Sequence, residues 1–264
     1  MDITKSIQNI RLLDDLSRND TFVHRLHPLV KLLTTVAYLV VVISFGKYEV
    51  GSMLPFVFYP ILIFAFAELP VLPVLKRLWI VAPFIIGIGI LNPLFDHTTF
   101  SLGTIIISRG WLNFLSIIIK CVLTVTAGFL LVATTGMDKL AAALRMLKVP
   151  KIFVLQLLLT YRYIGVLIEE AAGMMRAYSL RAPGQKGLHP RVWGSFLGQL
   201  LLRTFDRAQR VYQAMSLRGF SGEYHTGGSV KIGYKDVAYF VVWIAFFIIV
   251  RIYNIPVLLG SLFT

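Results

Sequence analysis

Apolar residues gather along the chain in five runs that are long enough, or nearly long enough, to cross a membrane. The runs lie at about 28–45, 50–67, 74–95, 111–133 and 237–262. A spanning helix needs about 20 mostly apolar residues to cross about 30 Å of hydrocarbon. Helices are expected because a backbone in lipid must satisfy its own hydrogen bonds, and no alternating barrel pattern is visible. The pattern therefore predicts an all-α membrane protein with about five transmembrane helices.

Composition agrees with this fold class. Hydrophobic residues make up 57% of the chain and charged residues 15%, and the mean hydropathy is +0.75. A soluble domain with a polar surface does not reach such values. The single cysteine, Cys121, lies in an apolar run and is expected to be an inert buried thiol. The first 27 residues are charged and lack an apolar segment, so we expect no cleavable signal peptide.

Lysine and arginine are distributed unevenly between the segments that join the apolar runs. Five lie before or at the entry of the first run, two between the second and third runs, and fifteen between Thr134 and Lys235, which is 22 of the 26 basic residues. Only Lys47, Arg109 and Arg251 fall on the opposite side. The positive-inside rule then predicts a cytoplasmic N-terminus and an external C-terminus. The net charge of +13 fits anionic lipid headgroups or an acidic protein partner better than nucleic acid.

These boundaries divide the chain into four expected parts. Residues 1–27 form a cytoplasmic N-terminal segment, and 28–133 form transmembrane helices 1–4. Residues 134–235 form a cytoplasmic region, and 236–264 contain the fifth transmembrane helix and the external C-terminus.

The region 134–235 is expected to hold three helices. The first is "TTGMDKLAAALRMLKVP" (134–150), and the others cover about 151–181 and 191–218, separated by the turn-forming string "APGQKGLHP". The helix at 191–218 is amphipathic. Apolar or small residues form one stripe along this helix, which we call its apolar stripe: Trp193, Leu197, Leu200, Thr204, Ala208, Val211 and Met215. Two interpretations stay open: amphipathic helices resting on the membrane surface, or long crossed helices that pack on a partner.

Two of these helices end alike. One finishes with Ser179, Leu180, Arg181 and Ala182, and the other with Ser216, Leu217, Arg218 and Gly219. Ordinary C-terminal capping explains one such ending, because a cation opposes the negative helix end and glycine accepts a left-handed cap. Capping does not explain why two helices end with the same four-residue pattern. A guanidinium beside a small residue also suits docking, since the small residue lets a partner approach and the guanidinium forks onto carboxylates or carbonyl groups.

With these features the chain resembles the transmembrane T component of energy-coupling factor (ECF) transporters, bacterial importers of vitamins and metal ions. The resemblance covers nearly the whole chain. It rests on "VHRLHPLVKLL" (23–33), "TTGMDKLAAALRMLKVP", "YRYIGVLIEEAAGMMRA" (161–177) and the paired Ala-Arg-Gly-type motifs. Leucine stands where the family usually has alanine, and the first motif lacks its glycine. The "VHRLHP" stretch is closer to the cobalt and nickel branch than to the shared vitamin module.

The resemblance implies a coupling role. Arg181 and Arg218 with their neighbours would each dock in a groove of one of two ATP-binding-cassette ATPase subunits. A separate membrane S component would bind the substrate, and the chain would lie in the cell membrane. It would transmit ATP-driven motion without being an enzyme.

Motif absences in the sequence agree with that expectation. There is no G-x-x-x-x-G-K-[ST] loop, so ATP is expected on partner subunits and no cofactor on this chain. No catalytic or metal-ligating constellation appears, and Asp96-His97 is a poor metal site. Lys120, near the middle of the fourth run, is either functional, or a lysine that snorkels or is paired within the bundle. The rival interpretation is a self-contained secondary transporter or a membrane-embedded enzyme.

Overall fold

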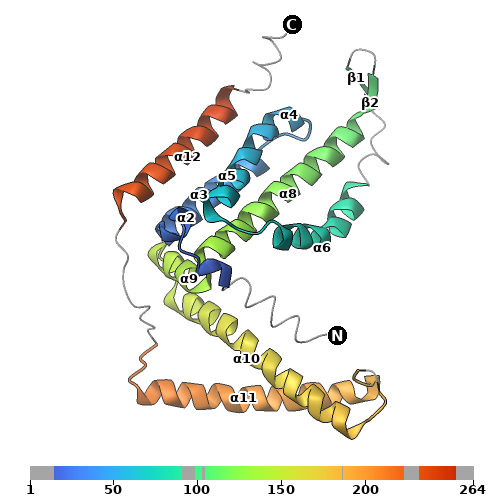
Figure 1. Cartoon of the computed structure of the whole chain (residues 1–264), viewed down its shortest axis with the longest axis vertical. Helices are drawn as coiled ribbons and strands as arrows, with labels where there is room; N and C mark the ends of the chain where they lie inside the picture. The colour runs from blue at the N-terminus through green and yellow to red at the C-terminus, as the bar shows by residue number, and fades with distance from the viewer. Residues whose placement is uncertain (1–14, 91–98, 103–104, 186, 223–231, 254–264) are drawn as a thin grey trace. The chain divides into compact units, whose positions relative to one another are not determined.

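The computed structural model describes residues 15–90, 99–102, 105–185, 187–222 and 232–253. Within them the regular secondary structure is helical apart from one hairpin, in which β1 (Thr99–Leu102) pairs antiparallel with β2 (Ile105–Ser108) (Figure 1). The helices are α2 Phe22–Arg25, α3 Pro28–Ile43, α4 Val50–Met53, η1 Leu54–Val57, α5 Phe58–Ala67, α6 Leu72–Gly89, α8 Arg109–Thr135, α9 Met137–Met146, α10 Lys151–Arg181, η2 Pro190–Val192, α11 Trp193–Leu217 and α12 Tyr234–Tyr253. The all-helical prediction is confirmed, with this short hairpin as a local exception.

The chain forms two compact units. We call residues 16–136 and 230–264 the bundle unit, and residues 1–15 and 137–229 the arm unit. The chain passes from bundle to arm after Gly136 and returns at Val230. The arm unit therefore interrupts the sequence of the bundle unit once.

The bundle unit is organised around α8, a helix of 27 residues. Helices α3, α5 and α6 pack against α8, and α12 packs along α3 (Figure 1). Aromatic rings fill the space between α3, α5 and α12. Tyr38 and Tyr59 stack with ring centroids 4.5 Å apart, and Phe247 lies 5.5 Å from Tyr38. Such rings bury large apolar areas, so this cluster fixes α12 to α3 and α5, whose rings Tyr38 and Tyr59 lie 209 and 188 residues before Phe247.

Three helices among the described residues are long and apolar enough to cross a membrane, judged by length and composition. They are Val50–Ala67, Gly110–Thr135 and Lys151–Arg181, and Pro28–Ile43 is a shorter apolar helix. The first two coincide with the second and fourth predicted runs. The third was expected in the cytoplasmic region. It qualifies because its first half, 152–159, is strongly apolar, whereas its second half carries the charged residues. Residues 91–95 and 254–262 of the other predicted runs lie outside the described residues.

The arm unit contains α9, α10 and α11. Helix α9 packs on the start of α10, where Ala141, Ala143, Val154 and Leu155 are buried. The chain begins α10 immediately after Pro150, as the proline in the sequence predicts. Helix α11 has no buried residue, and its apolar stripe is only partly covered within the described chain: Leu200, Thr204, Val211 and Met215 are half-buried, whereas Trp193, Leu197 and Ala208 are exposed. The expectation that this stripe packs on a further helix stays a prediction.

Candidate docking site at two helix ends

The first of the two similar helix ends closes without a glycine cap. Helix α10 ends at Arg181, and the N–H of Ala182 donates to the carbonyl of Tyr178 at 3.0 Å. The chain then folds back, and the Tyr178 hydroxyl donates to Oε1 of Gln185 at 2.7 Å. Ser179 turns its hydroxyl inward to a backbone carbonyl of its own helix at 2.8 Å. This end is held by side chains as well as by backbone groups.

The second end is a Schellman motif. Arg218 is the capping residue of α11, and Gly219 follows it with φ +80°. The N–H of Gly219 donates to the carbonyl of Ser216, and the N–H of Phe220 donates to the carbonyl of Met215, both at 3.0 Å. These are the two hydrogen bonds that define the motif, and they satisfy carbonyl groups that the helix leaves unpaired.

The two backbones explain why only the second motif has glycine after its arginine. At Gly219 the left-handed conformation disfavours any residue with a Cβ. Ala182 has φ −124°, which an ordinary residue adopts without strain, and the left-handed glycine of the first end comes two residues later, at Gly184. The departure from the usual family motif therefore follows from a different turn. It leaves the preceding arginine in place.

Despite these different turns, the two ends present the same chemistry. The side chains of Leu180 and Leu217 are 82% and 90% exposed, far more than leucine usually is. Arg181 and Arg218 are exposed beside them. Within the described part of the chain, neither guanidinium has a hydrogen bond or an ion pair. Each end is therefore an unpaired cation next to an uncovered apolar side chain.

An ion pair joins α10 to α11 between these ends. Nη1 of Arg203 on α11 lies 2.5 Å from Oε1 of Glu170 on α10, and Nη2 of Arg207 lies 4.0 Å from Oε2 of the same carboxylate. One carboxylate thus holds two arginines that are one helical turn apart. The ribbons of the two helices cross in this part of the arm unit (Figure 1).

The position of this ion pair limits how far apart the two ends can lie. Arg181 is eleven residues beyond Glu170, and Arg218 is fifteen residues beyond Arg203. At 1.5 Å per residue these arms measure about 17 Å and about 23 Å. The two exposed ends therefore lie within about 40 Å of each other. Because both arms are helical, this separation is set by the crossing.

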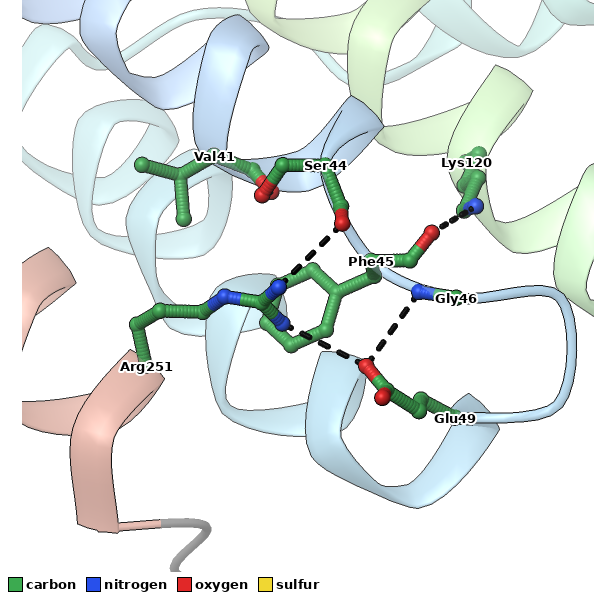
Figure 2. Close-up of polar contacts among 7 residues, drawn as sticks. All are labelled: Val41, Ser44, Phe45, Gly46, Glu49, Lys120 and Arg251. Atoms are coloured by element: carbon green, nitrogen blue, oxygen red, sulfur yellow. Dashed lines mark hydrogen bonds and ion pairs between the residues drawn. The ribbon is translucent and has the colours of Figure 1, made fainter.

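Lys120, in contrast, is engaged inside the bundle unit. Figure 2 shows its ammonium group aimed at the loop that follows α3, where it donates to the carbonyl of Phe45 at 2.7 Å. From α12, Arg251 donates to the carbonyl of Ser44 at 3.2 Å and pairs with Glu49 at 3.3 Å. Two cations thus satisfy carbonyl groups at the C-terminal end of α3, where positive charge is favoured. The structure favours pairing within the bundle over a functional Lys120.

The histidines of the "VHRLHP" stretch bind groups of their own chain. Nε2 of His24 lies 3.0 Å from the carbonyl of Leu16, so this nitrogen carries the proton, and Nδ1 accepts from the Thr21 hydroxyl at 2.7 Å. Nδ1 of His27 accepts from a backbone N–H at 3.2 Å. No three His, Cys, Asp or Glu residues gather into a metal-binding group among the described residues. Asp96-His97 lies outside them.

Sequence reasoning did not identify Glu170 and Arg203 as partners. Both look like ordinary charged residues of amphipathic helices. The signal lies in the spacing of Arg203 and Arg207, which puts two cations on one face of α11 opposite a carboxylate of α10. Nothing in the sequence identifies the residue of α10 that meets them.

Comparison with known proteins places this sequence in a family. Residues 19–227 match the family model described as cobalt transport protein, CbiQ. An uncharacterized protein of Methanocaldococcus jannaschii is 25% identical over 228 residues, which is 79% of this chain and 78% of that protein. The nickel permease LarQ of Lactiplantibacillus plantarum is 28% identical over 43% of both chains. The cobalt transport protein CbiQ of Rhodobacter capsulatus is 35% identical over 35% of this chain and 38% of that protein.

The family match extends over both helix ends, so it covers most of the arm unit as well as most of the bundle unit. Two named relatives match the chain over less than half of their own length. The family model matches most of the chain, and it describes a membrane transport protein. The chain therefore belongs to the CbiQ cobalt transport protein family, the T components of ECF transporters.

Proposed function

We propose that this chain is the coupling subunit of an ATP-driven importer. It is a non-catalytic scaffold that receives motion from two ATPase subunits and passes it to a membrane subunit that binds the substrate. ATP is bound by the partner subunits. The chain lies in the cell membrane with its N-terminus and arm unit in the cytoplasm and its C-terminus outside.

The observation that carries this proposal is the pair of helix ends at Arg181 and Arg218. Each presents an unpaired cation beside a leucine that is more than four-fifths exposed. Burying a leucine in a partner's groove stabilises a complex by about 1.5–3 kcal/mol. A guanidinium that forks onto carboxylate or carbonyl groups adds direction to this contact. Two exposed ends of this kind favour a partner with two similar grooves.

The ion pair of Glu170 with Arg203 supports a dimeric partner in particular. It ties the two helices at one point, and each arm from that point to its arginine is a single continuous helix. Two helix ends held at a fixed distance can bind two related subunits at once. Once the first end is bound, binding of the second end is intramolecular and therefore favoured. A monomeric partner with one groove would bind only one of the two helix ends.

For the substrate, the proposal is a micronutrient metal ion such as cobalt or nickel. Two relatives are named as a cobalt transport protein and a nickel permease, and the family model is named for cobalt transport. A vitamin remains the other substrate class that the resemblance implies. In either case specificity belongs to the substrate-binding membrane subunit, because this chain offers no cluster of metal ligands among its described residues.

The rival proposal is a self-contained carrier or a membrane-embedded enzyme. Such a protein needs polar side chains aimed into a path or a site within its spans. Thr34 and Thr35, which are buried in α3, instead donate to carbonyl groups one turn earlier in their own helix, at 2.9 Å. Lys120 likewise serves a backbone carbonyl. These contacts favour a scaffold.

Purification through a tag on this chain, followed by reconstitution in liposomes, tests the proposal. A coupling subunit recovers ATPases and a second membrane subunit, and uptake of Co²⁺ or Ni²⁺ requires ATP on the side of the ATPases. The matched control is this chain alone in the same liposomes, which should import nothing. Transport by the chain alone, without ATP, would support the rival.

A further inference from the structure

The turn between α9 and α10 exposes apolar side chains beside lysines. We call residues 146–153 the α9–α10 turn, and all of them belong to the arm unit. Met146 and Leu147 are each 43% exposed, and Ile152 and Phe153 are 64% and 62% exposed. Two lysines lie between these pairs and are exposed as well. Four uncovered apolar side chains therefore flank two cations.

The first lysine, Lys148, has a backbone conformation that favours glycine, with φ +61°. Its N–H donates to the carbonyl of Arg145 at 3.1 Å, and the N–H of Val149 donates to the carbonyl of Leu144 at 3.3 Å. These are the hydrogen bonds of a Schellman motif, as at the end of α11, where Gly219 has the left-handed conformation. A lysine at this position costs conformational free energy that a glycine does not.

The second lysine, Lys151, is the first residue of α10. The N-terminal end of a helix carries partial positive charge, so a cation is disfavoured there. Both lysines of the turn thus occupy positions that the local backbone disfavours, one by conformation and one by charge. Residues that break a local rule in this way cluster at functional sites.

The sequence around the turn is basic throughout. Residues 139–168 contain five lysines or arginines and no aspartate or glutamate. The charge of this segment therefore suits an anionic partner, whereas the uncovered side chains of the turn suit an apolar one. The boundary between headgroups and acyl chains in a membrane with anionic lipids has both properties.

The chain itself keeps this turn close to a predicted span. Helix α8 is apolar enough to cross a membrane and ends at Thr135, and only Gly136 separates it from α9. Helix α9 has ten residues, which measure about 15 Å at 1.5 Å per residue. The path along the chain from the end of α8 to the turn is therefore about 20 Å at most, which keeps the turn within reach of lipid headgroups.

We propose that the α9–α10 turn binds the membrane surface, with its four apolar side chains at the acyl boundary and Lys148 and Lys151 on the phosphate groups of anionic lipids. The stems of the lysines add apolar surface to this contact while their ammonium groups stay among the headgroups. The inference goes beyond the proposed coupling function and uses only the orientation proposed with it. An acidic protein surface is the alternative occupant.

The test uses the full chain in bilayer nanodiscs without partner subunits. A fluorophore is attached to Ile152→Cys in a Cys121→Ala background, and lipids with a nitroxide at the acyl boundary quench it on contact. Nanodiscs of phosphatidylcholine alone are compared with nanodiscs of phosphatidylcholine and phosphatidylglycerol. The matched labelling site is Leu180→Cys, another exposed apolar position at the other end of α10.

We expect quenching at Ile152→Cys, stronger with phosphatidylglycerol, and none at Leu180→Cys. In the anionic membrane Lys148→Gly should lower the ratio of bound to free turn about fivefold, the factor that one lysine contributes near such a surface. In phosphatidylcholine alone it should leave this ratio unchanged. Arg162→Gln removes an exposed cation farther along α10 and should keep the wild-type ratio in both membranes.

Thermal unfolding separates this role from a purely structural one. Lys148→Gly relieves the left-handed conformation, so it should unfold at the wild-type temperature or above while it loses lipid contact. Phe153→Ser should reduce quenching in both lipid compositions, because it removes apolar area rather than charge. Apolar and charged contributions to the contact are thereby measured separately.

Absence of quenching at Ile152→Cys in both membranes would overturn the proposal. Equal quenching at Leu180→Cys would do the same, because contact would then not be specific to the turn. So would a lower unfolding temperature of Lys148→Gly with unchanged quenching. A label at Ile152→Cys that is free of lipid in the chain alone, but shielded once partner subunits are added, would assign the turn to a protein interface instead. Each outcome is read on the chain without ATPases, so failure of the coupling proposal is seen separately.

Discussion

Glu170 on α10 and Arg203 on α11 form the ion pair that joins the two long helices of the arm unit, with Arg207 as a second, more distant cation. The arginine side chain is 55% exposed and the glutamate side chain 28% exposed. Solvent therefore screens the pair, and its contribution to the free energy of folding is small. Its importance lies in the angle and span of the two helices.

Charge reversal at this pair should weaken docking modestly. Arg203→Glu puts two carboxylates together and is expected to destabilise the crossing by about 1 kcal/mol, the upper range for exposed pairs. Recovery of ATPases should fall at low salt and less so at high salt. The swapped double variant Glu170→Arg/Arg203→Glu should restore recovery. Failure of the swap to improve on Arg203→Glu would contradict the assigned role of the pair.

The cap of α11 gives a second prediction. Gly219→Ala forces a Cβ into a left-handed conformation and should destabilise this helix end by about 1–2 kcal/mol. The effect is conformational, since nothing lies within 4 Å of the added Cβ. Ala182→Gly is the matched variant at the other end, where φ is already ordinary, and it should have an effect below about 1 kcal/mol.

Gly219→Ala and Ala182→Gly are compared by their thermal unfolding and by the recovery of ATPase subunits. We expect Gly219→Ala to lower both quantities more than Ala182→Gly does. The reverse order would show that the two turns have been assigned wrongly.

The predicted orientation can be checked with cysteine labelling. In a Cys121→Ala background, Gly187→Cys should resist a membrane-impermeant thiol reagent in intact cells, because residues 134–235 are predicted to be cytoplasmic. The control, Lys47→Cys, is in the loop after α3 on the predicted outer side and should react readily. Labelling of Gly187→Cys in intact cells, with no reaction at Lys47→Cys, would reverse the topology.

Helix positions were largely predictable from the sequence. The proline at 150 and the charged, small-residue ending at Arg181 predicted α10 with the bounds that the structure has. The apolar runs at 50–67 and 111–133 predicted the helices α4 to α5 and α8, because hydrophobic length is a local property. The hairpin at 99–108 was missed, since its short apolar strands lie between two spans and read as a loop.

The long-range contacts were less predictable. Lys31 counted in the sequence only as a basic residue at a membrane entry, and Asp236 was not singled out. Their partners, Thr134 and His27, are 103 and 209 residues distant along the chain. Similarly, Leu180 and Leu217 could be read from the motif, but their exposure depends on how the helices end. Such pairings depend on tertiary packing, which a local pattern does not encode.

Docking through the two helix ends is tested by the double variant Arg181→Glu/Arg218→Glu. Loss of a helix-capping effect is worth about 0.3–1 kcal/mol and would leave assembly intact. Reversal of a charge at a desolvated contact is worth about 2–5 kcal/mol, which weakens binding by more than tenfold. The two explanations of the repeated helix ending therefore differ measurably.

The measurement is recovery of ATPase subunits with the tagged chain, beside a control that makes the same change from cation to glutamate at exposed residues outside the two helix ends, Lys139→Glu/Arg162→Glu. If the two helix ends dock on the ATPases, Arg181→Glu/Arg218→Glu should stay folded in the membrane, lose both ATPases and have no ATP-driven uptake, while the control retains them. Recovery of both ATPases at the wild-type level from Arg181→Glu/Arg218→Glu would contradict the docking role of the two helix ends.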